Sequence, residues 1–440
     1  MTHAPPRTPD LSWAEPDPTR GPHVLRLTRG PFGHRHTYYA HNPFSRDGQA
    51  VLLMRYRPQD VRAEVGLIDL TSGAVRTFGD TASWRGLVGA NLRWASRWPG
   101  PQPADGVDRV LFADVEDGRA CLVVTQPGGQ DAQRFVHDHM ARSATMDGRF
   151  IYATTPFVGQ FPGGDFAPRD RTGLFRMDPS TGQWKLLVSV NDCLALHPRR
   201  DVISDWHLFI KQVHVHPRED ALLMMFGNDC WFQVLPHENP PVKSVYVCRL
   251  DGSALECVND DKAGHPSWHP TRRDVVRRVP APGGQPGERL AIHRGDADWR
   301  MDFLGEFTIG PHPLLGPDGQ CFVSEKGAER GGRAVRAIAL HDLINGGERT
   351  VAAHPPSDAP TTYFAQFLRH NRRPAPAELV AAIGRGDSPD DPVMLEPCPV
   401  WSHDGRYILF NSMDGDVSQL FAIDVAAAAR SSPAAGSSRR

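Results

Sequence analysis

A short motif recurs along almost the whole chain, and this repeat constrains the fold more than any other feature of the sequence. Each copy begins with a histidine, followed by proline or asparagine, two or three mostly apolar residues and a turn. Three such copies stand at 41–48, 265–270 and 312–319, and a fourth, at 398–405, has cysteine in the first place. A repeat at this scale indicates one structural unit built several times rather than several unrelated domains.

The unit itself has the pattern of a β-meander. In several copies the turn is Asp-Gly and an apolar run follows it, as at 50–54, 321–323 and 407–410. Asp-Gly between two β-prone runs favours a tight hairpin, because glycine readily adopts the positive φ of such turns. A third strand and often a short fourth follow. Four short antiparallel strands per unit are typical of a propeller blade.

Counting the first-strand positions gives the number of blades. They recur about every fifty residues where no insertion intervenes, which is typical of propeller repeats, and they are His41, Asn91, Ala141, Gln212, His265, His312 and Cys398. We therefore predict an all-β fold, a seven-bladed β-propeller of four-stranded antiparallel blades over 23–425, in which a strand at 23–27 completes the last blade. The segments 1–22 and 426–440 are expected to be disordered, with insertions near 156–170 and 353–392.

Two separate β-sandwiches are the competing architecture. They explain the frequency of turns equally well, but they do not explain one motif recurring across the whole chain. The 41 glycines and 40 prolines exclude the all-α classes. Seven scattered cysteines without a Cys-x-x-Cys pair argue against a disulfide framework and against a zinc knuckle.

Charge and hydropathy limit the partners. The 49 lysines and arginines nearly balance the 51 acidic residues, so no global basic field would hold nucleic acid or an anionic membrane. An anionic substrate must be met by a local site. No apolar stretch approaches the length of a spanning helix and no secretory signal is evident, so the default expectation is a soluble, cytoplasmic protein.

The first strands of a propeller line its central axis, so equivalent residues from different blades converge. His41, His265, His312 and Cys398 are therefore expected to face one another, where they could bind a metal or transfer protons. A histidine before a turn can also simply hydrogen-bond that turn, and a lone cysteine is often an inert buried thiol. Glu396 stands two residues before Cys398 and adds a candidate carboxylate ligand.

Other candidate groups surround this ring. Strand alternation would place Tyr39 on the same face as His41, with Arg35 in the preceding loop. His214 stands in the fourth blade close to Gln212. Imidazole with carboxylate or glutamine oxygen suits Mn, Fe, Zn or Ni better than Ca, and no ligand spacing decides among them. Motifs for nucleotide hydrolysis, zincin proteolysis and serine hydrolysis are absent from the sequence.

Several of these motifs resemble the oligogalacturonate lyase-type propellers. The blade-start histidines, Thr-Tyr-Tyr-Ala-His at 37–41, Gly-Ala-Asn-Leu-Arg-Trp at 89–94 and Trp-Ser-His-Asp-Gly at 401–405 carry the likeness, which spans roughly residues 30–425. Ulvan lyases and rhamnose–glucuronate lyases share that architecture. Because similar hairpins occur in non-catalytic Tol-type propellers, only the histidine ring is discriminating.

The resemblance implies β-elimination at a uronic acid. It matches His265 to the family's fifth-blade metal histidine and places Glu396 and Cys398 where the last-blade His-x-His ligands stand. Gln212 takes the place of a fourth-blade catalytic histidine. These departures point to another base, such as His41 with Tyr39 in the manner of ulvan-type lyases, to a different metal, or to a loss of activity.

The hypothesis from the sequence is thus a lyase acting on an anionic, uronate-containing oligosaccharide. His41 or His214 would be the base, Tyr39 the acid, and Arg35 or Arg300 the carboxylate clamp. A divalent metal, with manganese as first choice, would lie near His265, His312, Glu396 and Cys398. The alternatives are a non-catalytic propeller that binds a protein or glycan partner, and a hydrolase on the same scaffold, which would yield saturated products.

Overall fold

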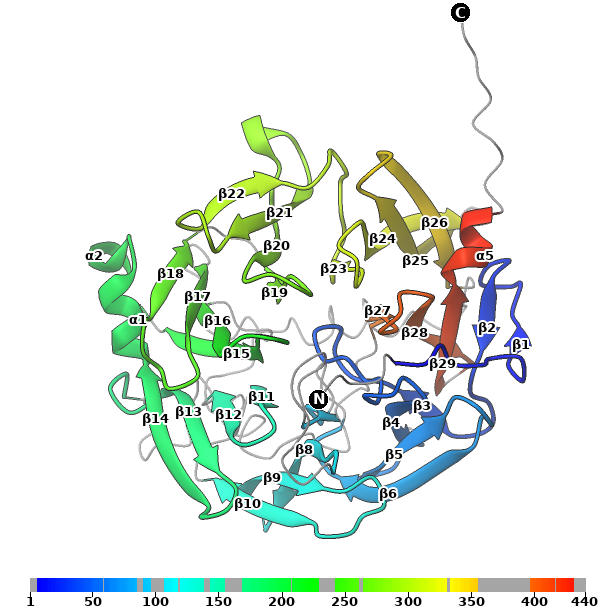
Figure 1. Ribbon diagram of the computed structural model, residues 1–440, viewed down its shortest axis with the longest axis horizontal. Helices are drawn as coiled ribbons and strands as arrows, with labels where there is room; N and C mark the ends of the chain where they lie inside the picture. The colour runs from blue at the N-terminus through cyan, green and yellow to red at the C-terminus, as the bar shows by residue number, and fades with distance from the viewer. Residues whose placement is uncertain are drawn as a thin grey trace, which may run out of the picture.

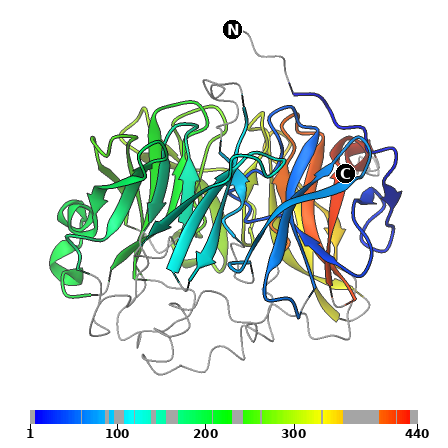
Figure 2. The same cartoon turned by 90° about the horizontal axis from the view of Figure 1, so that it is seen from below.

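Seven antiparallel sheets surround a common axis (Figure 1), so the predicted seven-bladed β-propeller is confirmed. The strands run between the two faces of the ring (Figure 2). The structure is a computed structural model that describes residues 6–57, 59–84, 90–95, 107–117, 119–137, 143–154, 168–206, 208–228, 242–260, 264–330, 333–354, 396–415 and 417–430. Ala141, most of the predicted insertion at 156–170 and that at 353–392, and the end of the tail, 431–440, lie outside these ranges.

The first four blades follow one another along the chain, each written here from the axis outward. Blade one contains β3 (Gly33–Arg35), β4 (Ala50–Tyr56), β5 (Ala63–Asp69) and β6 (Val75–Thr81). Blade two contains β7 (Arg93–Trp94), β8 (Val110–Glu116), β9 (Arg119–Thr125) and β10 (Gln133–His137). Blade three contains β11 (Ser143–Met146), β12 (Ile151–Thr154), β13 (Gly173–Asp178) and β14 (Gln183–Ser189). Blade four contains β15 (Phe209–Val215), β16 (Ala221–Gly227), β17 (Lys243–Arg249) and β18 (Glu256–Asn259).

Two further blades and a mixed last blade complete the ring. Blade five contains β19 (Ser267–Trp268), β20 (Val275–Pro280), β21 (Glu288–Arg294) and β22 (Arg300–Phe303). Blade six contains β23 (Leu314–Leu315), β24 (Cys321–Arg330), β25 (Arg333–Asp342) and β26 (Gly347–Ala353). The last sheet contains β27 (Val400–Trp401), β28 (Tyr407–Asp414), β29 (Val417–Asp424), β2 (Val24–Arg26) and β1 (Glu15–Pro16). The short helices are α1 (Val190–Leu196), α2 (Arg200–Ile203), the 3₁₀ turn η1 (Pro282–Gly284) and α5 (Val425–Arg430).

The ring is closed by strands from both ends of the chain. Val24 pairs with Ile423, and Arg26 with Phe421, so β2 becomes the fourth strand of the last blade. The predicted closing strand is therefore present. The sequence predicts disorder over 1–22, but β1 pairs with β2, and Asp17 next to β1 forms an ion pair with Arg26, which also pairs with Asp414 of β28. Residues 426–430 of the predicted tail belong to helix α5 (Val425–Arg430).

The Asp-Gly turns connect inner strands to second strands as the sequence predicts. Gly48, Gly319 and Gly405 have φ of 75°, 70° and 73°. In blade one, Asp47 Oδ1 accepts from Ser45 Oγ at 2.7 Å and from Gln49 N at 3.1 Å. The same contacts recur in the last blade. Side-chain acceptance of a backbone N–H two residues on is the property that makes aspartate a turn former.

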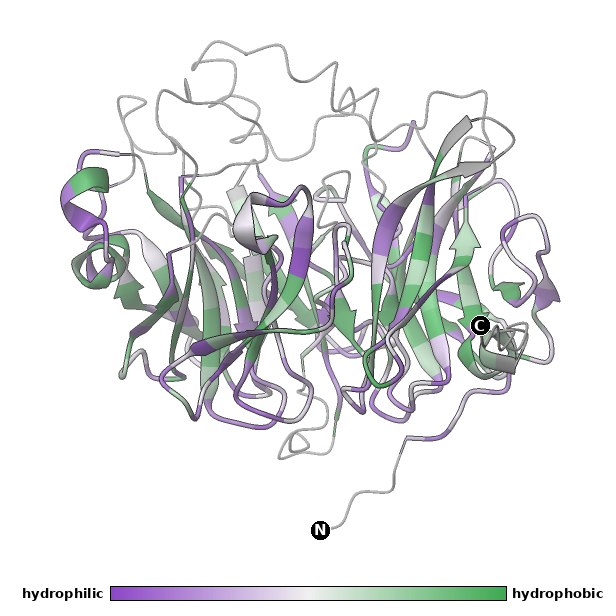
Figure 3. Cartoon of the chain, turned by 90° about the horizontal axis from the view of Figure 1, so that it is seen from above, coloured by the Kyte–Doolittle hydropathy of each residue, from purple (hydrophilic) through white to green (hydrophobic). Residues whose placement is uncertain are grey.

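The core lies between the blades rather than inside any one of them. In β4 consecutive residues are all buried: Val51 and Leu53 pack towards the last blade, whereas Leu52 and Met54 pack towards blade two. A strand covered on both faces needs a continuous apolar run, which explains the absence of strict alternation in the second strands. Figure 3 accordingly shows hydrophobic colouring along the strands and hydrophilic colouring over many of the connecting loops.

Three tryptophans on inner strands each form a hydrogen bond to the preceding blade. Trp94 Nε1 donates to the Pro43 carbonyl at 2.8 Å, Trp268 Nε1 to the His214 carbonyl at 3.0 Å, and Trp401 Nε1 to the Leu314 carbonyl at 3.0 Å. Each tryptophan stands three residues after a predicted blade start, and each acceptor belongs to the preceding blade. The repeat therefore fixes the spacing of blades around the axis as well as the local hairpin.

Candidate functional site

The blade-start residues share one backbone conformation. Asn91, His265, His312 and Cys398 each stand two residues before an inner strand and have φ of 52°, 60°, 53° and 46°. Positive φ is uncommon outside glycine, so its recurrence shows that the chain enters these four blades by the same local bend. His41 differs, because it lies in a turn after β3 and its N–H donates to the Tyr38 carbonyl at 2.8 Å.

The structure brings several of the predicted ring residues together. The ring centroids of His265 and His312 are 4.6 Å apart, and Tyr39 packs at 5.8 Å from His265 and 4.8 Å from His312. Cys398 is buried beside them, and its N–H donates to Glu325 Oε1 at 3.0 Å. Residues from blades five, six and seven, packed against Tyr39 of blade one, thus form one compact group, which we call the donor cluster: His265, His312, Glu325, Glu396 and Cys398.

His312 is held between two carboxylates. Its Nδ1 lies 2.7 Å from Glu325 Oε1, and its Nε2 lies 3.0 Å from Glu396 Oε2. Burial opposes the charged imidazolium, but the negative charges of Glu396 and Glu325 outweigh it and raise the pKa of His312 to about 9. A positive charge between these acids is therefore strongly favoured, whether it is carried by a proton or by a cation.

The donor cluster also fits a divalent metal ion by its chemistry. Ligand atoms of His312, Glu325 and Cys398 all lie within 4.8 Å of one another. His265 Nδ1, His312 Nε2 and Glu396 Oε2 are buried, yet none forms a hydrogen bond of good geometry with another described residue. Buried polar atoms are normally satisfied, so several orphans at one place indicate a missing partner. Imidazole, carboxylate and thiol together suit a first-row transition metal.

Tyr38 joins the donor cluster to His41. Its ring lies 5.3 Å from that of His312 and 5.9 Å from that of His41, and its hydroxyl accepts from Gln212 Nε2 at 3.3 Å. The predicted pairing of Tyr39 with His41 on one strand face is therefore not found. Strand alternation fails here because β3 ends at Arg35 and the segment after it bends towards the axis (Figure 1).

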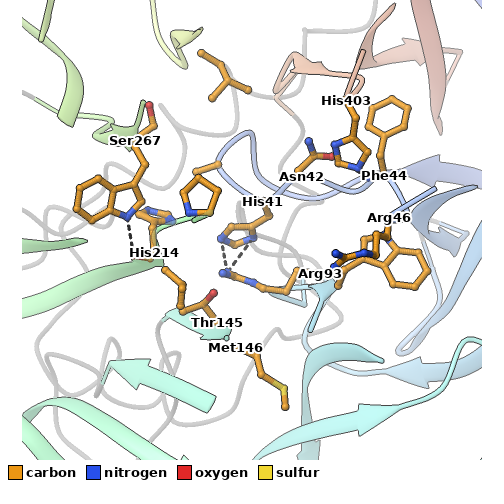
Figure 4. Close-up of a pocket in the computed structure, with 16 residues that line it drawn as sticks. His41, Asn42, Phe44, Arg46, Arg93, Thr145, Met146, His214, Ser267 and His403 are labelled. Carbon is orange, nitrogen blue, oxygen red and sulfur yellow. Dashed lines mark hydrogen bonds between the residues drawn. The ribbon is translucent and has the colours of Figure 1, made fainter. Parts of the chain in front are cut away.

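A pocket of about 210 Å³ lies on the axis next to His41 (Figure 4). Its walls come from the inner strands of blades two to six and from the segments that follow β3 and β27. The lining residues follow the donor cluster along these strands, since Ser267 and Trp268 come after His265, and Leu314 comes after His312. The lining comprises Ala40, His41, Asn42, Phe44, Arg46, Arg93, Trp94, Thr145, Met146, His214, Val215, Pro217, Ser267, Trp268, Leu314 and His403.

Arg93 is a buried cation in this pocket. Its side chain points at His41 (Figure 4) and donates to the Nε2 of that imidazole, and the residue is only 6% exposed. Burial lowers the pKa of Arg93 to about 9, which still leaves the guanidinium charged at neutral pH. Within the described ranges no carboxylate pairs with Arg93. A buried guanidinium without a counter-ion is unfavourable, so the pocket attracts an anion.

Two neutral imidazoles accompany Arg93. Burial and the Arg93 charge lower the pKa of His214 to about 3. Burial, Arg93 and His214 likewise hold the pKa of His41 well below its usual value. The lone pair of His41 is engaged by Arg93, whereas His214 Nε2 is buried and makes no hydrogen bond to another described residue. His214 is thus the imidazole with a nitrogen available to a ligand.

The two arginines predicted as carboxylate clamps lie elsewhere. Arg35, at the end of β3, is buried and donates to the Trp84 carbonyl. Arg300 lies on the outermost strand β22, where its side chain is 69% exposed and pairs with Asp302. Neither lines the pocket. The outer position of Arg300 could not be read from the sequence, because blade five is poorly marked by its turns.

Two residues of the site were missed by sequence reasoning. Arg93 stands inside the Asn-Leu-Arg-Trp segment at 91–94, on the two-residue inner strand β7. An arginine at an inner-strand position of the repeat could have indicated a positive charge at the axis. Glu325 is fully buried on β24. Its signal in the sequence is an acidic residue directly after the apolar run at 321–323, which could have indicated a polar group in the interior. Both signals need knowledge of which side chains face the axis.

Comparisons with known proteins concern the fold. An oligogalacturonate lyase from Vibrio parahaemolyticus aligns with a TM-score of 0.62 at 13% identity, covering 91% of this chain and 93% of its own. A solved oligogalacturonate lyase in complex with manganese gives a TM-score of 0.60 at 15% identity, covering 91% and 92%. TolB from Acinetobacter baumannii gives a TM-score of 0.38 at 11% identity, covering 70% and 64%.

No known family profile matches the chain, and no curated protein matches it in sequence. At identities this low the structural likeness shows the propeller architecture alone. None of the helices in the described ranges combines the length and the apolar character needed to cross a membrane.

Proposed function

We propose that the chain is a carbon–oxygen lyase that cleaves a uronate-containing oligosaccharide by β-elimination in the axial pocket. The observation that carries the proposal is the buried Arg93 guanidinium, which has two neutral imidazoles beside it and no carboxylate partner among the described residues. This is the set of groups that proton abstraction next to a carboxylate needs. The likeness of the fold to oligogalacturonate lyases agrees with it.

Arg93 would bind the uronate carboxylate. A guanidinium presents paired N–H donors that match a carboxylate, and in a dry pocket the charge interaction is strong. It would also stabilise the negative charge that develops when the neighbouring carbon loses its proton. Trp94, Trp268 and Phe44 give the pocket apolar walls against which a sugar ring can pack.

His214 is the better placed base. Its Nε2 would accept the proton from the carbon next to the carboxylate, and the electron pair of that C–H bond would form the new double bond. The glycosidic C–O bond then breaks, and its oxygen takes a proton from the His214 imidazolium, so protons balance. A bound carboxylate offsets the Arg93 charge that depresses the pKa of His214, so the base is strengthened when substrate is present.

His41 would position Arg93 rather than act on the substrate, because its ring nitrogen accepts from the guanidinium. Tyr39, predicted as the acid, packs against His265 and His312 and does not line the pocket. Gln212 contacts Tyr38 and so supports the turn that carries His41.

His265, His312, Glu396 and Cys398 would hold a divalent cation. When bound, it would supply a fixed positive charge at the axis, next to the Tyr38 that contacts His41. The pocket residues bind and orient the uronate and move its proton.

The test uses a panel of uronate oligosaccharides and polysaccharides, with the ultraviolet absorbance of the unsaturated product as the readout. Wild type should produce this absorbance on at least one member. Arg93→Met and His214→Ala should each lower the rate about 100-fold or more. Arg300→Met is the matched control, because it removes an exposed guanidinium on the outer strand, and it should retain full activity.

Two results would contradict the proposal. Equal activity of Arg93→Met and Arg300→Met would remove the clamp from the mechanism. Binding of a uronate that depends on Arg93 but gives no product would instead identify a glycan-binding propeller, the alternative to an enzyme.

A further inference from the structure

The donor cluster contains a thiol at the place where its other groups converge. Cys398 is 3% exposed, and its Sγ lies within 4.8 Å of a ligand atom of His312 and of a carboxylate oxygen of Glu325. His312 is fully buried and Glu396 is 5% exposed, and His312 Nε2 and Glu396 Oε2 are both without a good hydrogen-bond partner. A soft sulfur therefore lies in the same dry cluster as an imidazole nitrogen and a carboxylate oxygen that form an ion pair but no hydrogen bond of good geometry.

Glu325 already has partners for both of its oxygens. Oε1 accepts from His312 Nδ1 at 2.7 Å and from the Cys398 backbone N–H at 3.0 Å. Oε2 accepts from Arg336 at 2.9 Å. A carboxylate that holds the far nitrogen of an imidazole is the usual orienting partner of a metal-binding histidine. Glu325 thus fixes the ring of His312 so that Nε2, facing Glu396, is the nitrogen left for an ion.

The spacing of the remaining candidate ligand atoms agrees with this arrangement. His312 Nε2 and Glu396 Oε2 are 3.0 Å apart without forming a hydrogen bond of good geometry. Two donors on one tetrahedral zinc-sized ion, at bond lengths of about 2.0–2.1 Å, lie roughly 3.3 Å apart. His265 Nδ1, also buried and unpartnered within the described ranges, stands next to His312 as a further donor.

We propose that this site takes a thiophilic divalent ion of the zinc class in preference to manganese, with Cys398 as a thiolate ligand and Glu325 as the positioning carboxylate. Thiolate favours zinc and cobalt, whereas manganese is better matched by oxygen-rich sites. On binding, the thiol proton and any proton on His312 Nε2 leave to bulk water, and bonds from sulfur and nitrogen to the ion replace them. This inference deepens the metal part of the proposed function.

The first experiment measures selectivity without any substrate, so its outcome is independent of lyase activity. The full chain is stripped with a chelator, dialysed against equal concentrations of Zn²⁺ and Mn²⁺, and its metal content is determined. The proposal expects zinc to be retained and manganese to be excluded. Retention of manganese in place of zinc, or of neither ion, would overturn it.

The second experiment reports the sulfur ligand directly. Loaded with Co²⁺, the protein should show a near-ultraviolet thiolate-to-cobalt charge-transfer band. Cys398→Ser should lose this band, whereas the matched control Cys321→Ser, which removes a partly exposed thiol on β24, should keep it. A band that survives in Cys398→Ser, in a variant shown to be folded by its circular dichroism, contradicts thiolate ligation.

The third experiment concerns the positioning carboxylate. Glu325→Gln keeps the shape of the side chain but removes the negative charge that accepts the hydrogen bond from His312 Nδ1. The affinity for Zn²⁺ should therefore fall about 10–100-fold. The cobalt charge-transfer band should persist at saturating metal, because Cys398 is still present. Unchanged zinc affinity would show that Glu325 does not orient the ligand.

Discussion

At the scale of single residues, Arg93 has no counter-ion among the described residues. The guanidinium is buried, charged at neutral pH, and matched by imidazoles rather than by a carboxylate among the described residues. Structural arginines in cores are normally paired, so this one stores unfavourable energy that an anionic ligand would relieve. Sites of this kind exchange stability for function.

Removing this charge should therefore stabilise the fold while it abolishes activity. Arg93→Met keeps the length of the side chain without the buried charge, and the free energy of unfolding should rise by about 1–3 kcal/mol. Urea denaturation of Arg93→Met and Arg300→Met, compared with wild type, measures the change. Arg93→Met unfolding at a lower urea concentration than Arg300→Met would contradict a destabilising role of the charge.

The pH dependence of kcat/KM tests the state of His214. Burial and Arg93 lower the pKa of His214 to about 3, so the imidazole of the free protein stays neutral as pH falls until it nears that value. An unshifted imidazole with a pKa near 6.5 would lose roughly thirtyfold of its neutral form at pH 5. We expect kcat/KM to stay within about twofold between pH 7 and pH 5. A decline centred near pH 6.5 would mean that a different, solvated base acts.

At the scale of elements, the tryptophans link function to fold. Each indole N–H donates to a carbonyl of the preceding blade, and two of these tryptophans also form walls of the pocket. The sequence indicates that these residues recur at one position of the repeat. It does not indicate their acceptors, because the partner carbonyl belongs to another blade at a separation of more than fifty residues.

Trp401 allows this bond to be tested away from the pocket. Trp401→Phe keeps an aromatic ring but leaves the Leu314 carbonyl without its donor, which should lower the free energy of unfolding by about 1–2 kcal/mol. The matched control is Trp206→Phe, since the Trp206 indole has no hydrogen bond to another described residue. Equal thermal stability of the two variants would show that the bond between blades contributes nothing measurable.

At the scale of the whole molecule, the N-terminal segment closes the ring. Arg20 is 3% exposed, pairs with the buried Asp17 at 2.7 Å and donates from Nε to Ser412 Oγ at 3.0 Å in the last blade. Arg26 also pairs with Asp17, at 2.9 Å. These charges connect the first described strands to the last ones, so the two ends of the chain support one sheet.

Breaking this closure should cost more than breaking a surface ion pair nearby. Arg20→Ala leaves Asp17 with half of its compensation in a buried place, and the free energy of unfolding should fall by about 3 kcal/mol. Arg29→Ala removes an ion pair with Glu15 in which both side chains are more than half exposed, so its effect should be under about 1 kcal/mol. Similar urea midpoints for the two variants would contradict a closing role for Arg20.

The propeller architecture can be predicted from the sequence more completely than the residues of the candidate site. Seven blades can be counted because hairpins such as Asp47-Gly48 are local, and the closing strand is recognisable as an unpaired apolar segment. Arg93 and Glu325 could not be assigned because their roles arise from neighbours on other blades. Tyr38 rather than the predicted Tyr39 contacts His41, because strand β3 ends at Arg35 and strand alternation no longer applies after it.

If the axial pocket performs β-elimination on a uronate, the masses of the released fragments must show it, and mass spectrometry measures them. Wild type incubated with its best uronate oligosaccharide should release a fragment with a new double bond, lighter by one water than the product of hydrolysis, and Arg93→Met should release none. Saturated fragments that have gained water, or unsaturated fragments formed equally by Arg93→Met, would contradict it.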